Sequence, residues 1–199
     1  MGTLRLLVSK PISRTQLILV KFAAATIFTI LLLLWMAITS LLFSILIFGA
    51  DDMLIFRTKG EESQILLITR DDVVWRYLAA FAYATVALTV IAALSLFLSI
   101  FAENSIGPII ATVCIVIVCT IVSNLDVPII DRNVKPFLFT SYLVGWKGFF
   151  YVKAVDGVTV KGSIENLPAV LKSAAILVIY TFGFLGIAFW YFNRKNILS

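Results

Sequence analysis

Four basic residues are the most prominent candidates for binding chemistry in this sequence. Arg5, Lys10, Arg14 and Lys21 lie within the stretch from Gly2 to Lys21, which contains no acid. Each cation would cost a few kcal/mol near the middle of a bilayer, so this stretch is not expected to cross one. We expect it to lie at one membrane face, with its cations in water or paired with carboxylates or carbonyls of a partner. Its inward-facing apolar residues would be Leu4, Leu6, Leu7 and Ile12.

The sequence offers little for catalysis by this chain. It contains no His, the usual general base and a common metal ligand. Cys114 and Cys119 lie in an apolar run, where a thiol usually serves as a small apolar side chain. The Lys172-Ser173 pair lacks the glycines of a phosphate-binding loop. We therefore expect no enzyme activity, metal or cofactor in this chain itself. The cations form no nucleic-acid patch, so no nucleic acid is expected as a partner.

Composition predicts an integral membrane protein. The 199 residues are 61% hydrophobic, with a mean hydropathy of +1.06. Long apolar runs predict an all-α chain forming one domain, 1–199, with spans at 22–50, 73–101, 106–125 and 168–192. The first run, Phe22–Ala50, would be about 43 Å long as a helix, against a hydrocarbon core of about 30 Å. Part of it is therefore expected to protrude, or the helix to break near Gly49.

The two polar segments between spans are expected to form compact structure. In 51–72, β-prone runs flank Lys59-Gly60 and predict a small hairpin. Asp71 or Asp72 is expected to cap the next helix, and Arg76 to extend back to the surface.

In 126–167, Asp156-Gly157 predicts a second hairpin, and the preceding aromatic stretch predicts an interfacial or re-entrant helix. Interfacial anchoring is the simpler role for this aromatic stretch, and a gate for substrate exit is the alternative. The candidate gate residues are Phe137, Tyr142, Trp146, Phe149 and Phe150.

Four spans place both termini on one side of the membrane. The terminal segments carry six Lys and Arg residues (Arg5, Lys10, Arg14, Lys21, Arg194 and Lys195) and no acid, whereas the two long loops carry eight among several acids. The density of cations thus favours cytoplasmic termini, but their raw number does not.

Several motifs resemble those of type-2 ABC transporter permeases. Gly2-Thr3-Leu4-Arg5-Leu6-Leu7, followed by Lys10-Pro11-Ile12-Ser13-Arg14 and Lys21, is similar to the cytoplasmic coupling segment of that family. Two weaker matches are Leu94–Ser99, before a short turn, and the ending Phe192-x-Arg194-Lys195-Asn196-Ile197. In that family the coupling helix docks into a cleft of the ATPase subunit, and re-entrant helices occupy the outer side. The resemblance thus implies cytoplasmic termini in the cytoplasmic membrane of a bacterial cell.

The resemblance implies a permease subunit of an ATP-driven exporter. Its partners would be an ABC ATPase subunit that carries ATP and Mg, a second permease subunit in a homo- or heterodimer, and membrane lipid. The residues expected to contact the ATPase are Thr3, Arg5, Leu6, Leu7, Lys10, Pro11, Ser13 and Arg14. Family members carry an amphipathic helix and two spans ahead of this motif. Either this chain is a shortened form, or another chain supplies those spans.

Other functions compatible with the residues are a channel or ion-coupled carrier, and a structural or assembly membrane protein. The basic segment would then act only as a cytoplasmic anchor, with Ser13 at the start of a helix.

Overall fold

Four long helices dominate the computed structural model, which describes residues 14–49, 51–59, 62–102, 106–125, 127–155 and 158–194. They are α2 (Arg14–Phe48), α3 (Arg70–Ser99), α4 (Ile106–Asn124) and α7 (Leu167–Arg194). All four are long and apolar enough to cross a membrane. This finding confirms the helical class, and the described residues contain one sufficiently long apolar helix for each of the four predicted spans.

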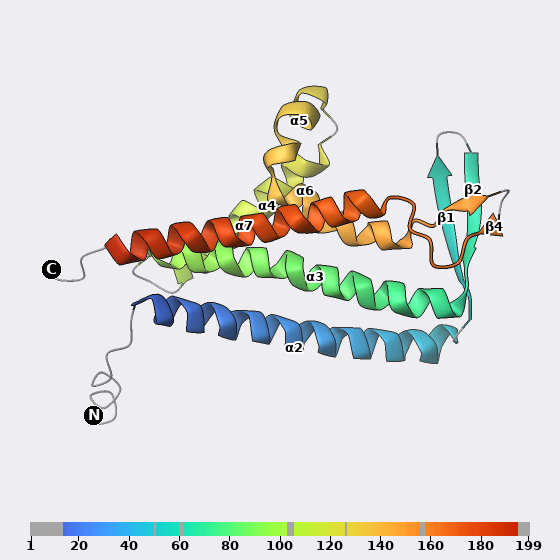
Figure 1. Cartoon of the computed structure of the whole chain (residues 1–199), viewed down its shortest axis with the longest axis horizontal. Coiled ribbons are helices and arrows are strands. Elements are labelled where there is room, and N and C mark those ends of the chain that lie inside the picture. Colours follow the sequence, from blue (N-terminus) through green and yellow to red (C-terminus); the bar gives the residue numbers. More distant parts are fainter. Residues whose placement is uncertain are drawn as a thin grey trace.

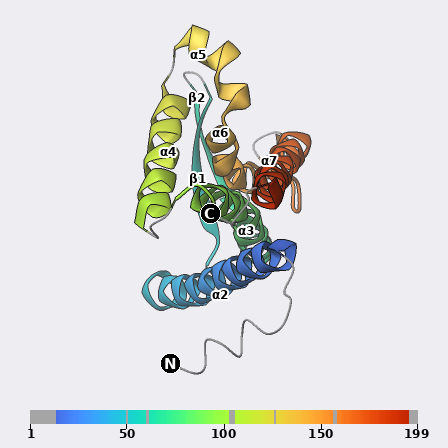
Figure 2. The same cartoon turned by 90° about the vertical axis from the view of Figure 1, so that its left-hand side faces the viewer.

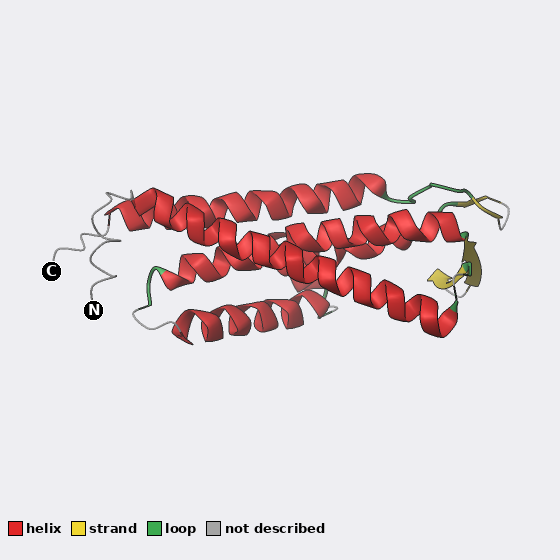
Figure 3. Cartoon of the chain, turned by 90° about the horizontal axis from the view of Figure 1, so that it is seen from below, coloured by secondary structure: helices red, strands yellow, loops and turns green. Residues whose placement is uncertain are grey.

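Helices α2, α3 and α7 run lengthwise through the molecule (Figure 1), whereas α4 lies at an angle to them (Figure 2). The rest of the chain is distributed unequally along this length. The strands gather at one end, called here the hairpin end (Figures 1 and 3). Helix α2 begins and α7 ends at the opposite end, called here the terminal end (Figure 1). Viewed from the terminal end, α3 lies between α2, α4 and α7 (Figure 2). Helix α3 is therefore the centre of the bundle, and it packs against all three of the others.

Helix α2 starts earlier than the sequence predicted. It begins at Arg14 rather than Phe22, so the last eight residues of the predicted coupling segment belong to it. No Pro or Gly interrupts residues 14–48, and the single cation Lys21 does not break a helix. Gly49, at a φ of +79°, ends α2 in the left-handed region that glycine adopts easily, and its N–H donates to the Ile45 carbonyl (3.0 Å). The predicted break near Gly49 is confirmed.

Both predicted hairpins form at the hairpin end. Strands β1 (Met53–Lys59) and β2 (Glu62–Ile68) pair antiparallel, with Met53 opposite Ile68. Strands β3 (Ala154–Val155) and β4 (Val158–Thr159) form a shorter pair. Thr159 Oγ1 donates to the Leu67 carbonyl (2.7 Å), which joins the second hairpin to the first.

The start of α3 differs from the prediction in its cap. Thr69 occupies the N-cap position and makes no side-chain cap bond, while Asp71 and Asp72 lie inside the first turn. Asp52, which lies between α2 and β1, accepts the Arg70 N–H through Oδ1 (2.9 Å). The first orphan N–H of α3 is thus satisfied by a carboxylate 18 residues earlier, and acids in the first turn also favour the helix dipole.

Helix α4 is shorter than the other three, with 19 residues and a length of about 28 Å. This length matches a hydrocarbon core of about 30 Å. Helix α2, with 35 residues, is about 52 Å long. Helix α4 could therefore cross the hydrocarbon core of a bilayer without tilting. Helix α2 is longer than that core is thick, so it must tilt strongly or extend beyond it.

The segment between α4 and α7 folds into four short helices instead of one. They are α5 (Pro128–Asn133), η1 (Lys135–Phe137), α6 (Phe139–Leu143) and η2 (Val144–Phe150). Helix α6 packs against α4 and α7, and η2 packs against α3 and α7. Buried side chains from three elements form the core there: Tyr83, Ala87, Val90, Leu94, Phe139, Val170 and Leu177.

Candidate functional site

The residues predicted to contact an ATPase fall mostly outside the described part of the chain. Thr3, Arg5, Leu6, Leu7, Lys10, Pro11 and Ser13 lie in residues 1–13, which are not described. Arg14 is the first residue of α2.

A buried arginine is the centre of a polar cluster near the hairpin end. Arg76, on the second turn of α3, has no exposed surface. Its Nη1 donates to the Phe149 carbonyl (2.5 Å), and its Nη2 donates to the Ser163 carbonyl (2.7 Å). Nη2 also lies 3.4 Å from Asp72 Oδ2. One side chain thus connects α3 to segments 73 and 87 residues further along the chain.

Asp72 extends this cluster to the turn after the second hairpin. Its Oδ2 accepts the Gly162 N–H (2.7 Å), and its Oδ1 accepts the Trp75 Nε1–H (3.1 Å). The Arg76 guanidinium also lies 4.7 Å from the centre of the Trp75 ring. The expectation that Arg76 extends to the surface is therefore wrong, because main-chain carbonyls and a carboxylate satisfy its charge inside the protein. A buried charge is tolerated only with such partners.

The five candidate gate residues do not form one cluster. Phe137 is 77% exposed, whereas Tyr142, Phe149 and Phe150 are half-buried. Trp146 is exposed and makes an edge-on contact with Phe150 at 6.3 Å between ring centres. The segment that contains all five therefore exposes Phe137 and Trp146, while Tyr142 and Phe149 pack against the buried core of the bundle.

Two tyrosine hydroxyls from the long helices hold the aromatic segment in place. Tyr83, on α3, donates to the Tyr142 carbonyl (2.6 Å). Tyr180, on α7, donates to the Phe137 carbonyl (2.6 Å). Together with Arg76, these donors attach η1, α6 and η2 to the bundle through main-chain oxygens. Buried tyrosines usually find such partners.

Close packing of η2 depends on two glycines. A Cβ at Gly145 would overlap the Tyr83 hydroxyl, and a Cβ at Gly148 would overlap the Val170 side chain. Both glycines therefore let the backbone of η2 approach α3 and α7 more closely than any larger residue would allow.

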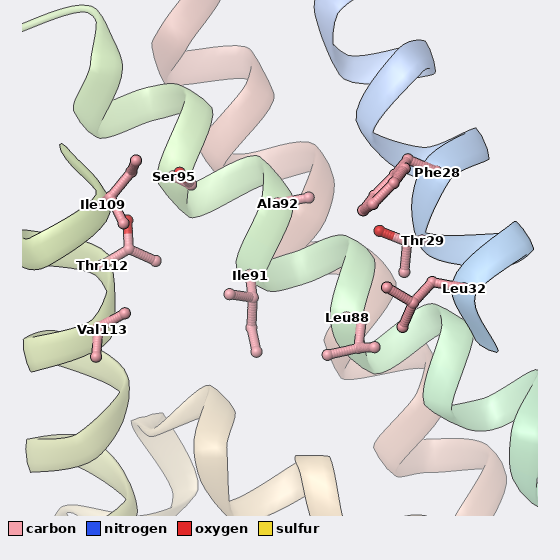
Figure 4. Close-up of a pocket in the computed structure, with 10 residues that line it drawn as sticks. All are labelled: Phe28, Thr29, Leu32, Leu88, Ile91, Ala92, Ser95, Ile109, Thr112 and Val113. Carbon is pink, nitrogen blue, oxygen red and sulfur yellow. The ribbon is translucent and has the colours of Figure 1, made fainter. Parts of the chain in front are cut away.

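An apolar groove of about 340 Å³ crosses α3 between α2 and α4. Figure 4 shows its lining, with Phe28, Thr29 and Leu32 on one side and Ile109, Thr112 and Val113 on the other. The hydroxyls of Thr29 and Thr112 donate to carbonyls of their own helices, Ala25 (2.9 Å) and Pro108 (2.7 Å). Their hydrogen bonds are satisfied locally, so the groove presents an apolar surface.

No group of His, Cys, Asp and Glu residues in the described part of the chain could hold a metal ion. Cys114 is exposed on α4, Cys119 is partly exposed, and both are free thiols. Among the described residues, Arg76 is the only charged side chain that is buried.

Sequence reasoning missed the residues that attach the aromatic segment: Arg76, Tyr83, Tyr180, Gly145 and Gly148. Only the glycine pair, spaced three residues apart within an aromatic stretch, carried a usable signal. That spacing favours close backbone approach, but it does not identify the opposing helix.

Comparison with known proteins adds the family but no activity. The model of the family described as "Protein of unknown function (DUF2705)" matches residues 1–198. The comparisons with curated proteins and with solved structures returned no match.

Proposed function

The chain belongs to the DUF2705 family, and we propose that it is the membrane-spanning permease subunit of an ATP-binding cassette exporter. The observation that carries the proposal is the basic Gly2–Arg14 segment, joined directly to the start of α2. Its sequence resembles the coupling segment of type-2 ABC permeases. Asp71 and Asp72 lie in the first turn of α3, and no acid lies further inside any described span. These spans therefore offer no carboxylate at mid-membrane depth for coupling to an ion.

Helix α2 supports the proposal as a mechanical element. It runs for 35 residues without a break, a length of about 52 Å. The Tyr77 hydroxyl of α3 donates to the Ala37 carbonyl of α2 (2.8 Å) and also contacts the Ser40 hydroxyl. A displacement of the basic segment would therefore pass along α2 and into α3.

In this mechanism the terminal end faces the cytoplasm, and a separate ATPase subunit supplies the energy. ATP closes two ATPase subunits, and the basic segments carry that movement into two permease subunits. Substrate then crosses along the interface between the permease subunits. The aromatic segment 137–150 lies at the outer side, where it either anchors the protein at the interface or gates substrate release.

The proposal is tested by charge reversal at the basic segment. The full chain is co-expressed with an ABC ATPase subunit of the same organism, and the two are co-purified. In the double variant Arg5→Glu, Arg14→Glu we expect the ATPase to be lost, because these cations would pair with acids or carbonyls on it. The matched control, Lys153→Glu with Lys161→Glu, reverses two exposed cations near the hairpin end and should retain the ATPase.

Retained association in the Arg5, Arg14 variant would overturn the proposal. Accessibility labelling of Lys10→Cys from the cell exterior would also overturn it, because that residue would then lie on the wrong face. Transport driven by an ion gradient alone, in vesicles without the ATPase, would favour a channel or carrier instead.

A further inference from the structure

A half-enclosed cavity lies at the hairpin end, where α2 finishes and α3 begins. It measures about 370 Å³, and its lining includes Ser44, Phe48, Asp51, Arg70 and Val74. A second cavity, of about 420 Å³ and with apolar lining, runs between the same two helices from Leu34 to Leu46 of α2. Leu41, Ile45 and Tyr77 line both cavities. The apolar groove and the polar cavity therefore adjoin at these three residues; together they are called here the slot, and the polar cavity is called its mouth.

The length of the apolar part indicates what it would accept. Leu34 and Leu46 are twelve residues apart on α2, a distance of about 18 Å along the helix. Half of a hydrocarbon core of about 30 Å is about 15 Å. The slot is thus about as long as one leaflet, and its volume is within the range of small-molecule sites.

Charged residues of both signs line the mouth, from the segment that follows α2 and from the start of α3. On one side, α2 ends without a basic residue in its last turn, so the negative end of its dipole is not compensated there. Asp51 adds a carboxylate to this side. Its Oδ2 lies close to Gly49: a Cβ added to that glycine would be 3.4 Å from this oxygen. This side of the mouth favours a cation.

The other side of the mouth favours an anion. Arg70, exposed at the first position of α3, lines the cavity. Asp71 and Asp72 already complement the dipole at this end of α3, so the attraction for an anion comes from the Arg70 guanidinium itself. Asp52 lines the same cavity, but its Oδ1 already accepts the Arg70 N–H.

From this arrangement we propose that the slot binds a zwitterionic membrane lipid. One acyl chain occupies the groove between α2 and α3, the ammonium group of the head lies beside Asp51 and the end of α2, and the phosphate lies beside Arg70. The proposal is independent of the transporter function proposed above, because it uses neither the basic segment nor an ATPase.

The test compares two lipids with identical acyl chains. The full chain is purified in detergent and incubated with equal amounts of phosphatidylethanolamine, which has both charges, and phosphatidylglycerol, which lacks the amine. Native mass spectrometry counts the lipid adducts. We expect phosphatidylethanolamine adducts to predominate. Asp51→Asn should lower that preference by up to about fivefold, the size expected for an exposed ion pair, whereas Arg70→Gln should weaken both lipids.

Matched variants separate the slot from general charge effects. Asp71→Asn removes an acid in the first turn of α3 that lines neither cavity, and it should change nothing. Leu41→Trp fills the wall shared by both cavities and should reduce both lipids. Leu41→Ala keeps the slot open, so the preference should persist even if the tryptophan variant fails to fold.

Three results would overturn the proposal. They are equal binding of the two lipids, an unchanged preference in Asp51→Asn, and full competition by glycerophosphoethanolamine. That last compound carries the same head without acyl chains, so its success would show that the apolar slot contributes nothing.

Discussion

Replacing Arg76 should release the aromatic segment from α3. Arg76→Ala leaves the carbonyls of Phe149 and Ser163 without their donor, and Asp72 without its buried cation. Removing one partner of a buried ion pair typically costs about 3–5 kcal/mol. A free-energy change of 1.36 kcal/mol is a factor of ten, so local opening should become more frequent by about two to four orders of magnitude.

Hydrogen exchange of the purified chain measures this opening directly. The informative amides are Gly162, which donates to Asp72, and Glu165, which donates to the Tyr151 carbonyl (2.9 Å). Both should exchange faster in Arg76→Ala, whereas amides in the middle of α7 should not change. Arg76→Lys keeps the charge but not the planar fork that bonds two carbonyls, so its effect should be intermediate.

The control is Arg132→Ala, which removes the same side chain from an exposed position on α5. It should leave Gly162 and Glu165 unchanged. A change of less than tenfold at both amides in Arg76→Ala would refute the reasoning, because it would mean that the arginine does not hold the two segments together.

Three further substitutions test the packing described above, each by the thermal midpoint of the purified chain. Tyr83→Phe removes the donor to the Tyr142 carbonyl and should destabilise by about 1–3 kcal/mol, the cost of an unsatisfied buried polar group; an unchanged midpoint would show that water replaces the hydroxyl. Gly145→Ala forces a methyl group against the Tyr83 hydroxyl and should lower the free energy of unfolding by about 1–3 kcal/mol. Its control is Gly183→Ala, whose added methyl group meets nothing within 4 Å. Equal effects of the two substitutions on the midpoint would count against the close approach of η2 to α3. Gly49→Ala places a side chain at a φ of +79° and should cost about 1–2 kcal/mol, and a stabilised variant would contradict that strain.

The long elements were predictable because their signals are local. The span that became α4 was predicted to within one residue, since an uncharged run of β-branched residues is bounded on both sides by polar ones. Both hairpins also followed from short patterns around their turns. The start of α2 was missed because Lys21 was treated as a boundary, although a single cation near a helix end is compatible with a helix.

The polar contacts were not predictable because their partners are distant in sequence. Nothing near Arg76 indicates that the carbonyls of Phe149 and Ser163 come within hydrogen-bond distance, 73 and 87 residues away. Surface exposure was therefore the reasonable expectation for an arginine one turn into a span. The same limit applies to Tyr83 and Tyr180, whose hydroxyls find carbonyls 59 and 43 residues distant.

The way in which the aromatic segment is attached has a consequence for its evolution. Arg76, Tyr83 and Tyr180 all reach main-chain oxygens, and a main-chain oxygen is present whatever amino acid occupies the position. Mutations at exposed positions such as Phe137 and Trp146 can therefore accumulate without detaching the segment. Related chains should keep the three donors and diversify the surface that they hold, so the outer face could acquire new molecular preferences while the scaffold beneath it stays the same.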